Sequence, residues 1–280
     1  METSAERSFG PLPEAQILEA IRSQPILTRR PVGSTSVNLH LDLEGDIDAG
    51  WKPHATTHRE RYRAEIAAFR LNRLLGLSRV PPAVSRAIGR TTLRLAPDSP
   101  VVFERDGRAR GAAMYWVPVL RDSGVDRPSE IERWTRQLQL STALRPDQSA
   151  RLEQISTLLV FDLLTGNWDR WSGANIPADA QGELLYRDNN GAFDEPFLDS
   201  QLRQSLHWLR RTQRFRRSVI DRARGLTEAS VRAEMALDPD PEHPPLSDAQ
   251  IRSLLRRRDA LVGYVDGLVT RFGPDRVYAW

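Results

Sequence analysis

A single lysine and a few carboxylates are the residues of this chain whose types and order could act on a phosphate group. Lys52 is the only lysine, and all the other residues among the 40 lysines and arginines are arginine. Arginine presents a planar fork and does not easily replace a compact ammonium group that reaches between two phosphates. We therefore take Lys52 as a candidate functional residue, against the alternative of a surface lysine that survived by chance.

Phosphoryl transfer requires four kinds of part. A lysine neutralises the nucleotide phosphates, a carboxylate on a helix positions that lysine, a second carboxylate orients the acceptor hydroxyl, and an Asn/Asp pair holds divalent ions. The chain contains these parts in the order in which kinases have them, namely Lys52, Glu65, Asp169 with Asn175 in one loop, and Asp188 in the next loop. The pattern predicts a metal-dependent enzyme that transfers a phosphate to a hydroxyl group.

The first part of the chain is predicted to hold these residues on strands and one helix. A short leading helix is expected within 13–23. Apolar and polar residues alternate over 37–43, which predicts a strand with one buried face, and 47–52 is the expected return strand that carries Lys52. Helical spacing over 59–77 places Glu65 on the next helix. Two further strands are expected, over 91–95 and 101–104.

The second part is predicted to be mainly helical. Helices are expected over 130–140, 146–164, 199–223 and 228–237, and a capping-box pattern at 247–250 starts a last helix that runs to about residue 271. The loop with Asp169 follows the apolar helix, and the loop with Asp188 follows a short strand. Strands before helices, with a hinge expected at 116–118, predict an α+β fold of two lobes.

Three segments resemble the secretory-pathway kinases, the four-jointed and Golgi casein kinase group. The segment AEIAAFRLNRLLGLSRVPPAVSR at 64–86 is similar to the helix that carries the lysine-pairing glutamate in that group. The segment GNWDR at 166–170 resembles its catalytic loop, and DNNG at 188–191 resembles its metal loop. The resemblance extends from about residue 33 to residue 193, and the order of the three motifs makes it specific.

This resemblance implies a two-lobed atypical protein-kinase-like fold. Together with the leading helix, it predicts a helical extension at 1–24, a strand-rich N-lobe with one helix at 25–117 and a larger helical C-lobe at 118–280, with the nucleotide in the cleft. It also implies that ATP and Mg²⁺ or Mn²⁺ are the cofactors and that the acceptor is a hydroxyl group of a protein or a sugar.

The resemblance likewise implies roles for particular residues. Lys52, Glu65 and Asp169 are the expected catalytic residues, and Asp188 and Asn175 are the expected metal ligands. The turn after the first strands and the hinge are expected to contact the nucleotide, through Gly33, Ser34, Thr35, Ser36, Trp116 and Val117 together with Lys52.

Two features depart from the family pattern. The family members are secreted and disulfide-bonded, whereas this chain has no cysteine and no apolar signal segment near its start, so we expect a bacterial, cytoplasmic relative. Asn175 follows Asp169 by six residues instead of five. That spacing leaves Ser172 or Asp194 as alternative metal ligands.

Other functions stay open beside the phosphotransferase. A kinase-like site can transfer AMP instead of phosphate, and a nucleotide-binding regulator would bind ATP without catalysis. A net charge of +3 gives little reason to expect a nucleic-acid partner, and no segment approaches the roughly 20 apolar residues of a membrane span. An arginine-rich nucleic-acid binder would also leave the Lys52, Glu65, Asp169 and Asp188 set unexplained.

Overall fold

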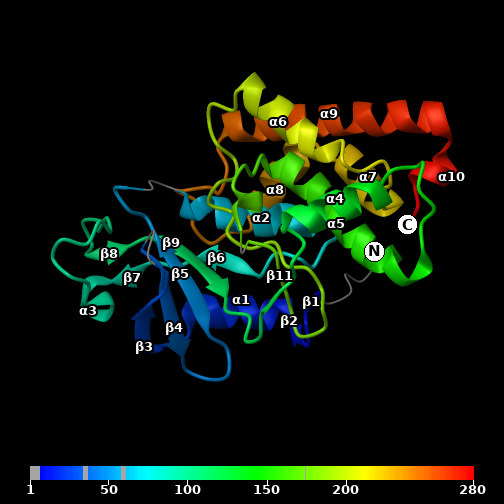
Figure 1. Cartoon of the computed structure of the whole chain (residues 1–280). Coiled ribbons are helices and arrows are strands. Elements are labelled where there is room, and N and C mark those ends of the chain that lie inside the picture. Colours follow the sequence, from blue (N-terminus) through cyan, green and yellow to red (C-terminus); the bar gives the residue numbers. More distant parts are fainter. Residues whose placement is uncertain (1–6, 34–36, 58–60, 174) are drawn as a thin grey trace, which may run out of the picture. The chain divides into compact units, whose positions relative to one another are not determined.

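The chain forms two compact units, each assembled from separate stretches of sequence. The computed structural model describes residues 7–33, 37–57, 61–173 and 175–280. Unit 1 comprises residues 1–70, 80–118 and 235–245, and unit 2 comprises residues 71–79, 119–234 and 246–280. Figure 1 shows the sheet of unit 1 and the helices of unit 2. The division into 1–24, 25–117 and 118–280 made from the sequence stays a prediction.

A five-stranded antiparallel sheet forms the centre of unit 1. Its strand order is β3 (Ile26–Pro31), β4 (Leu39–Leu43), β5 (Ala49–Pro53), β9 (Gly111–Tyr115) and β6 (Ala83–Ser85). The predicted strand is confirmed and the three leucines of β4 are buried, but His40 on its opposite face is buried as well. The expected hairpin is also present, because β4 and β5 pair directly.

Short elements surround this sheet in unit 1. Strands β1 (Ser8–Phe9) and β2 (Leu12–Pro13) pair with each other, as do β7 (Ile88–Gly89) and β8 (Arg108–Ala109). Helix α1 (Glu14–Ser23) confirms the leading helix and packs on β6 and β9, with Ile17 and Ile21 fully buried. Helix α2 (Tyr62–Leu74) confirms the helix that carries Glu65, and its last residues belong to unit 2.

The prediction of strands over 91–95 and 101–104 is wrong. The first segment is a one-turn helix, α3 (Arg90–Leu93), which ends at Arg94 in the left-handed conformation with a φ of 41°. The Arg94 N–H donates to the Arg90 carbonyl and closes that turn. In the second segment Val101 makes only an isolated bridge to Ala55. The β-branched threonines suggested a strand, but the helical turn satisfies the backbone locally.

Helices form most of unit 2. They are α4 (Pro128–Gln137), α5 (Pro146–Thr165), α6 (Asp199–Leu209), α7 (Arg217–Arg224), α8 (Glu228–Met235), α9 (Asp248–Phe272) and α10 (Pro274–Val277), with the short pair β10 (Arg121–Asp122) and β11 (Pro177–Ala178). Helix α5 packs against α6 and α9, and all of its residues from 155 to 165 are buried. The predicted capping box is confirmed, because Gln250 N donates to Ser247 Oγ at 3.2 Å.

The single helix predicted over 199–223 is instead two helices, α6 and α7, with a connection at 210–216. The connection has no glycine or proline to announce it. Thr212 makes it possible, because its hydroxyl accepts from Arg214 N–H and donates to the Arg214 carbonyl. Phe215 is then fully buried. The arginines of this region were expected on one helix, but Arg214 binds the carbonyls of Gln139 and Thr142 and so has a structural role.

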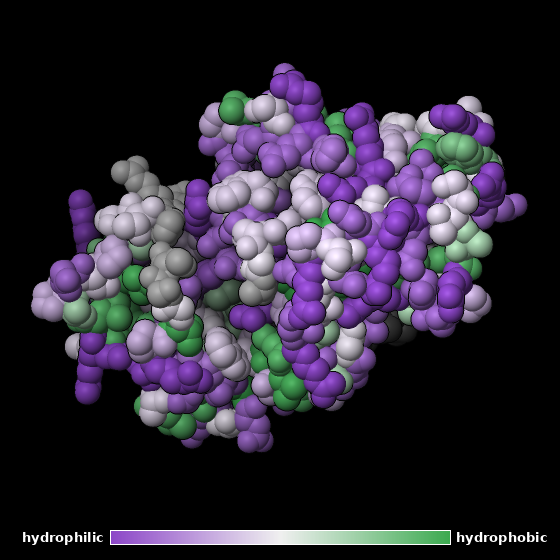
Figure 2. Space-filling view, in the orientation of Figure 1, coloured by the Kyte–Doolittle hydropathy of each residue, from purple (hydrophilic) through white to green (hydrophobic). Residues whose placement is uncertain are grey.

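The surface carries mostly polar side chains. Figure 2 shows a face on which hydrophilic residues prevail and apolar residues occur in small scattered groups. This distribution is ordinary for a folded chain, because polar atoms alone cannot cover a protein surface. Within the described residues, the helices are all too short or too polar to cross a membrane.

Candidate active site

The lysine and the glutamate predicted to act together lie side by side in unit 1. Lys52 Nζ on β5 is 2.5 Å from Glu65 Oε1 on α2. The side chains are only 14% and 5% exposed, so water screens the pair weakly. The structure therefore brings together two residues that are 13 positions apart in the sequence, on a strand and a helix as predicted.

Local structure explains how the pair is held. Glu65 lies in the first turn of α2, where the positive end of the helix dipole favours a carboxylate. Lys52 lies opposite Ala112 in the β5–β9 ladder. Gly111 allows this close pairing, because a Cβ atom there would lie 2.4 Å from the Lys52 carbonyl oxygen and 2.7 Å from the Trp51 ring. A side chain at position 111 would push β9 away from the strand that carries the lysine.

The predicted nucleotide contacts lie around the same sheet. Gly33 follows β3, is exposed and has a φ of 75°, which glycine adopts without strain. Ser34, Thr35 and Ser36 lie outside the described residues. Trp116 and Val117 follow directly after β9, and both are partly exposed.

Trp116 is fixed by contacts to β4 and to the connection between β4 and β5. Its backbone N–H donates to the Asp48 carbonyl at 3.0 Å. Its ring packs edge-on against the His40 ring, with the centroids 4.4 Å apart. The buried His40 ring has Asp42 at 2.9 Å from Nδ1 and Asp48 at 3.4 Å from Nε2. The structure thus places the His40 ring between two carboxylates, which lie near opposite ring nitrogens. Nδ1 makes no hydrogen bond to a described residue.

In unit 2, the end of helix α5 positions the loop that carries Asp169. Gly166 ends the helix with a φ of 67°, and its N–H bonds to the Leu163 carbonyl. The Asn167 N–H reaches back to the Asp162 carbonyl at 3.2 Å, which completes a Schellman-type helix end. A Cβ atom on Gly166 would also lie 2.6 Å from the Phe197 ring. Glycine is therefore required where the helix turns into the loop.

Asp169 and Asn175 lie in one loop, and the side chain of Asn175 is hydrogen-bonded to the backbone carbonyl of Asp169. The side-chain amide Nδ2 of Asn175 donates to the Asp169 carbonyl at 3.0 Å, and the hydroxyl of Ser172 donates to the same carbonyl at 2.8 Å. Asp169 is partly exposed, and no described residue donates a hydrogen bond to its carboxylate. The loop therefore fixes the backbone of Asp169, while its carboxylate accepts no hydrogen bond from a described residue.

The loop that carries Asp188 lies against the Asp169 loop. Asp188 adopts the left-handed conformation with a φ of 53°, which aspartate tolerates better than most residues. Asn167 joins the two loops, because its Oδ1 accepts from Asp169 N–H at 3.1 Å while its Nδ2 approaches the Asp188 carbonyl at 3.4 Å. A Cβ atom on Gly191 would lie 3.0 Å from Asp169 Cβ. Asn167 thus braces the two loops.

Arg170 ties these loops to helix α5, and the sequence did not reveal this role. Its guanidinium group is fully buried and donates to Asp162 Oδ1 at 3.0 Å and to Asn189 Oδ1 at 2.6 Å. It also donates to the carbonyls of Asn175 and Arg187. The ion pair of Arg170 is therefore made with Asp162 and not with its neighbour Asp169. The available signal was Asp162 itself, the single carboxylate in the apolar stretch 155–165 of α5.

The Asp162–Arg170 pair is electrostatically unusual. Burial raises the pKa of Asp162 to about 6, although the neighbouring Arg170 charge lowers it. Oδ1 of Asp162 accepts from Arg170, and Oδ2 has no hydrogen-bond partner among the described residues. An incompletely bonded carboxylate in the core is costly. Its retention is consistent with a role in holding Arg170 between the two loops.

The remaining candidates near the loop have other partners. Trp168 is 51% exposed, and its indole N–H donates to Asp194 Oδ2 at 3.0 Å. Asp194 was the alternative metal ligand, and the structure gives it this bond to Trp168. Trp171 stacks on Trp208 with the rings 4.6 Å apart and 6° from parallel, so it packs the loop against α6. Trp171 therefore packs the loop, whereas Trp168 is exposed and bonds to Asp194.

The oxygen atoms of Asp188 and Asn175 fit a hard divalent cation. Mg²⁺ and Mn²⁺ prefer carboxylate and carbonyl oxygens, and both residues supply such atoms. The side-chain nitrogen of Asn175 is bound within its own loop, to the Asp169 carbonyl and to Ser172 Oγ, so the amide oxygen is the atom that could bind a cation. The donor set present in unit 2 is therefore suitable for the predicted ions.

Known proteins with similar sequences are kinases by name. The chain is 26% identical over 281 residues to the protein named glycosaminoglycan xylosylkinase from Homo sapiens, covering 84% of this chain and 65% of that protein. The protein of the same name from Danio rerio is 26% identical over 265 residues, covering 80% of this chain and 62% of that protein. The chain thus spans less than two thirds of the length of these relatives. No family model matches the chain.

Solved structures with the same fold come from the same group. A structure of hydra Fam20 with sugar has a TM-score of 0.69 at 19% identity and covers 94% of this chain and 91% of its own. The Golgi casein kinase has a TM-score of 0.67 at 18% identity, covering 95% and 79%, and a structure of it with Mn/ADP bound has a TM-score of 0.65. The predicted two-lobed α+β atypical kinase fold and the resemblance to secretory-pathway kinases are confirmed.

Proposed function

We propose that this chain is a metal-dependent phosphotransferase that moves the γ-phosphate of ATP to a hydroxyl group of a sugar or a protein. The observation that carries the proposal is the shielded contact between Lys52 Nζ and Glu65 Oε1 at 2.5 Å. A lysine held in this way presents a fixed positive charge to nucleotide phosphates. The paired loops with Asp169 and Asp188 in unit 2 supply the other parts that the reaction requires.

Each protein residue has a distinct task in the proposed reaction. Lys52 neutralises the α- and β-phosphates, and Glu65 keeps its ammonium group in place. The Asp169 carboxylate accepts a hydrogen bond from the acceptor hydroxyl, which directs the oxygen lone pair at the γ-phosphorus. The new O–P bond forms as the bond to the leaving ADP breaks, and the hydroxyl proton passes to Asp169.

Asp188 and the amide oxygen of Asn175 would hold Mg²⁺ or Mn²⁺. When bound, such an ion neutralises charge on the phosphate oxygens. The Mn/ADP complex of the structurally similar Golgi casein kinase supports ATP and Mn²⁺ as cofactors here. The bracing of both loops by Asn167 and Arg170 would keep the two ligand residues at a fixed separation.

The relatives suggest two acceptor classes to test. The curated relatives are named as xylosylkinases of glycosaminoglycans, and the structural relative is named as a casein kinase. A β-xyloside and casein are therefore suitable acceptors for a first assay. The bacterial origin and cytoplasmic location expected from the sequence are part of the proposal, and fractionation of the source cells would test the location.

The deciding experiment uses ATP labelled at the γ or, separately, at the α position. Purified protein is incubated with Mg²⁺ or Mn²⁺ and each acceptor, with Asp188→Ala as the control. We expect label from γ-labelled ATP alone, and none with the Asp188→Ala variant. Label from the α position would show AMP transfer, which the six-residue spacing from Asp169 to Asn175 leaves open. ATP binding without any transfer of label would indicate a regulator.

A further inference from the structure

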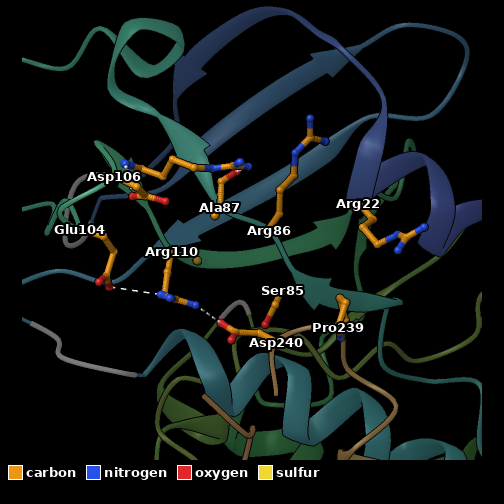
Figure 3. Close-up of a pocket in the computed structure, with 11 residues that line it drawn as sticks. Arg22, Ser85, Arg86, Ala87, Glu104, Asp106, Arg110, Pro239 and Asp240 are labelled. Atoms are coloured by element: carbon orange, nitrogen blue, oxygen red, sulfur yellow. Dashed lines mark hydrogen bonds and ion pairs between the residues drawn. The ribbon is translucent and has the colours of Figure 1, made fainter. Parts of the chain in front are cut away.

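A polar pocket of about 410 Å³ lies in unit 1 among residues that have no part in the proposed reaction. It is bordered by the end of α1, the connection between β6 and β7, the turn before β8, and residues 239–240 (Figure 3). Its volume is that of an ordinary small-molecule site. Seven of the residues that border it are charged, four of them arginines and three of them carboxylates.

One side of this pocket is electrically balanced. Arg110 donates to Asp240 Oδ2 at 2.7 Å and to Glu104 Oε1 at 3.2 Å, and it also reaches Glu242 at 3.4 Å. Figure 3 shows Glu104, Arg110 and Asp240 as a connected row, with Arg86 extending away from it. Because the charge of Arg110 is already neutralised by carboxylates, this row is not an anion receptor.

The other side has two guanidinium groups that bind only backbone carbonyls. Arg86 donates to the carbonyls of Ile21 and Gln24, at 2.9 and 2.5 Å. Arg108 donates to the Ala87 carbonyl at 2.6 Å. Within the described parts of the chain, neither arginine forms an ion pair. The carbonyls fix the positions of these groups but leave their positive charges in place.

The two arginines also repel each other. Burial lowers the pKa of Arg86, and the positive charge of Arg108 lowers it further. Asp106, which also borders the pocket, accepts a hydrogen bond from the Arg108 backbone N–H at 2.9 Å. An anion between the guanidinium groups would offset the repulsion and would bind them through charge-assisted hydrogen bonds.

We propose that this pocket binds a small phosphate- or carboxylate-bearing molecule through Arg86 and Arg108, whereas Arg22, which also borders the pocket, is paired with Glu19 at 2.5 Å. An extended polyanion is disfavoured, because Glu104, Asp106 and Asp240 border the same pocket and would repel its remaining charges. The site is independent of the phosphotransferase proposal, since it shares no residue with the Lys52–Glu65 pair.

Calorimetric titration with inorganic phosphate and, separately, citrate tests this site and distinguishes the two anion classes. The variant is Arg108→Gln, because Arg108 is exposed and its loss should leave folding intact, which circular dichroism would check. Lys52→Met controls for anion binding at the proposed nucleotide-phosphate site. Arg133→Gln removes an exposed arginine of unit 2 and controls for the change in net charge.

We expect at least one of the two anions to bind the unaltered chain, with the dissociation constant raised about tenfold by Arg108→Gln. Lys52→Met and Arg133→Gln should leave that constant unchanged. The proposal is overturned if Arg108→Gln has no effect, if Lys52→Met alone abolishes binding, or if neither anion binds at millimolar concentration.

Discussion

Lys52 and Glu65 form a contact of 2.5 Å between strand β5 and helix α2. Both side chains are largely shielded from water, so loss of either partner would leave an uncompensated charge. The strand fixes the lysine backbone through its ladder to β9, and the helix fixes the glutamate in its first turn. The strand and the helix therefore hold in position the charge that the proposed reaction needs.

Replacement of either partner should abolish most phosphotransfer. We expect Lys52→Met and Glu65→Gln to lower kcat/KM by about 100-fold or more, because the phosphates lose a fixed positive charge. Lys52→Arg should also be poor, since the guanidinium fork is larger than the ammonium group and differs in shape. The assay is transfer from γ-labelled ATP, with circular dichroism to verify folding. Near-normal transfer by folded Lys52→Met would exclude the proposed role.

Gly191→Ala should impair catalysis more than stability. The added Cβ would lie 3.0 Å from Asp169 Cβ and 3.1 Å from Asn167 Oδ1, so these neighbours must move by a few tenths of an ångström. We expect kcat to fall about tenfold, because small displacements of catalytic groups are costly. Gly263→Ala is the matched control, since its Cβ would meet no atom within 4 Å. Equal kcat values for the two variants would show that Asp169 tolerates the shift.

The sequence predicted those parts of the site that depend on local pattern. The alternation before Lys52 placed it on a strand, and the helical spacing around Glu65 placed it on the next helix. The two short polar loops after apolar segments located Asp169 and Asp188. Each of these inferences needs only a residue type and the period of its neighbours.

The parts that were missed depend on tertiary contacts. Arg170 looks like any other arginine in a chain rich in arginine, and only the fold brings Asp162, Asn189 and two loop carbonyls around it. The break between α6 and α7 also depends on tertiary contacts. The hydrogen bonds of Thr212 and the burial of Phe215 outweigh the helix propensity of this segment.

Arg170→Met should destabilise the chain and disable the loops. The substitution leaves Asp162 without its partner in the core, and we expect the free energy of unfolding in urea to fall by about 3–5 kcal/mol. The double variant Asp162→Leu with Arg170→Met should recover part of this loss, because both charges are then removed. Phosphotransfer should stay low in the double variant, since the loop carbonyls still lack their donor. Full recovery of both properties would contradict the bracing role.

The stability of the chain should depend on pH through Asp162, with a sign opposite to that of an ordinary salt-bridged carboxylate. Burial raises the pKa of this group to about 6 in the folded chain, against about 3.9 for an unfolded aspartate. Between these values the folded chain holds a proton that the unfolded chain has released. Stability from this group is therefore present at low pH and is lost as the pH rises toward 6, by about 2–3 kcal/mol.

Asp162→Asn isolates this contribution because asparagine does not titrate. We expect the free energy of unfolding of the unaltered chain, minus that of the variant, to decrease between about pH 4 and 6 and then to level off. Asp266→Asn is the control, since Arg224 lowers the pKa of Asp266 and its contribution changes only below about pH 4. Its difference curve should be flat over the same range. A curve for Asp162→Asn that is flat or rises would show that Asp162 is ionised throughout, with Arg170 outweighing the effect of burial.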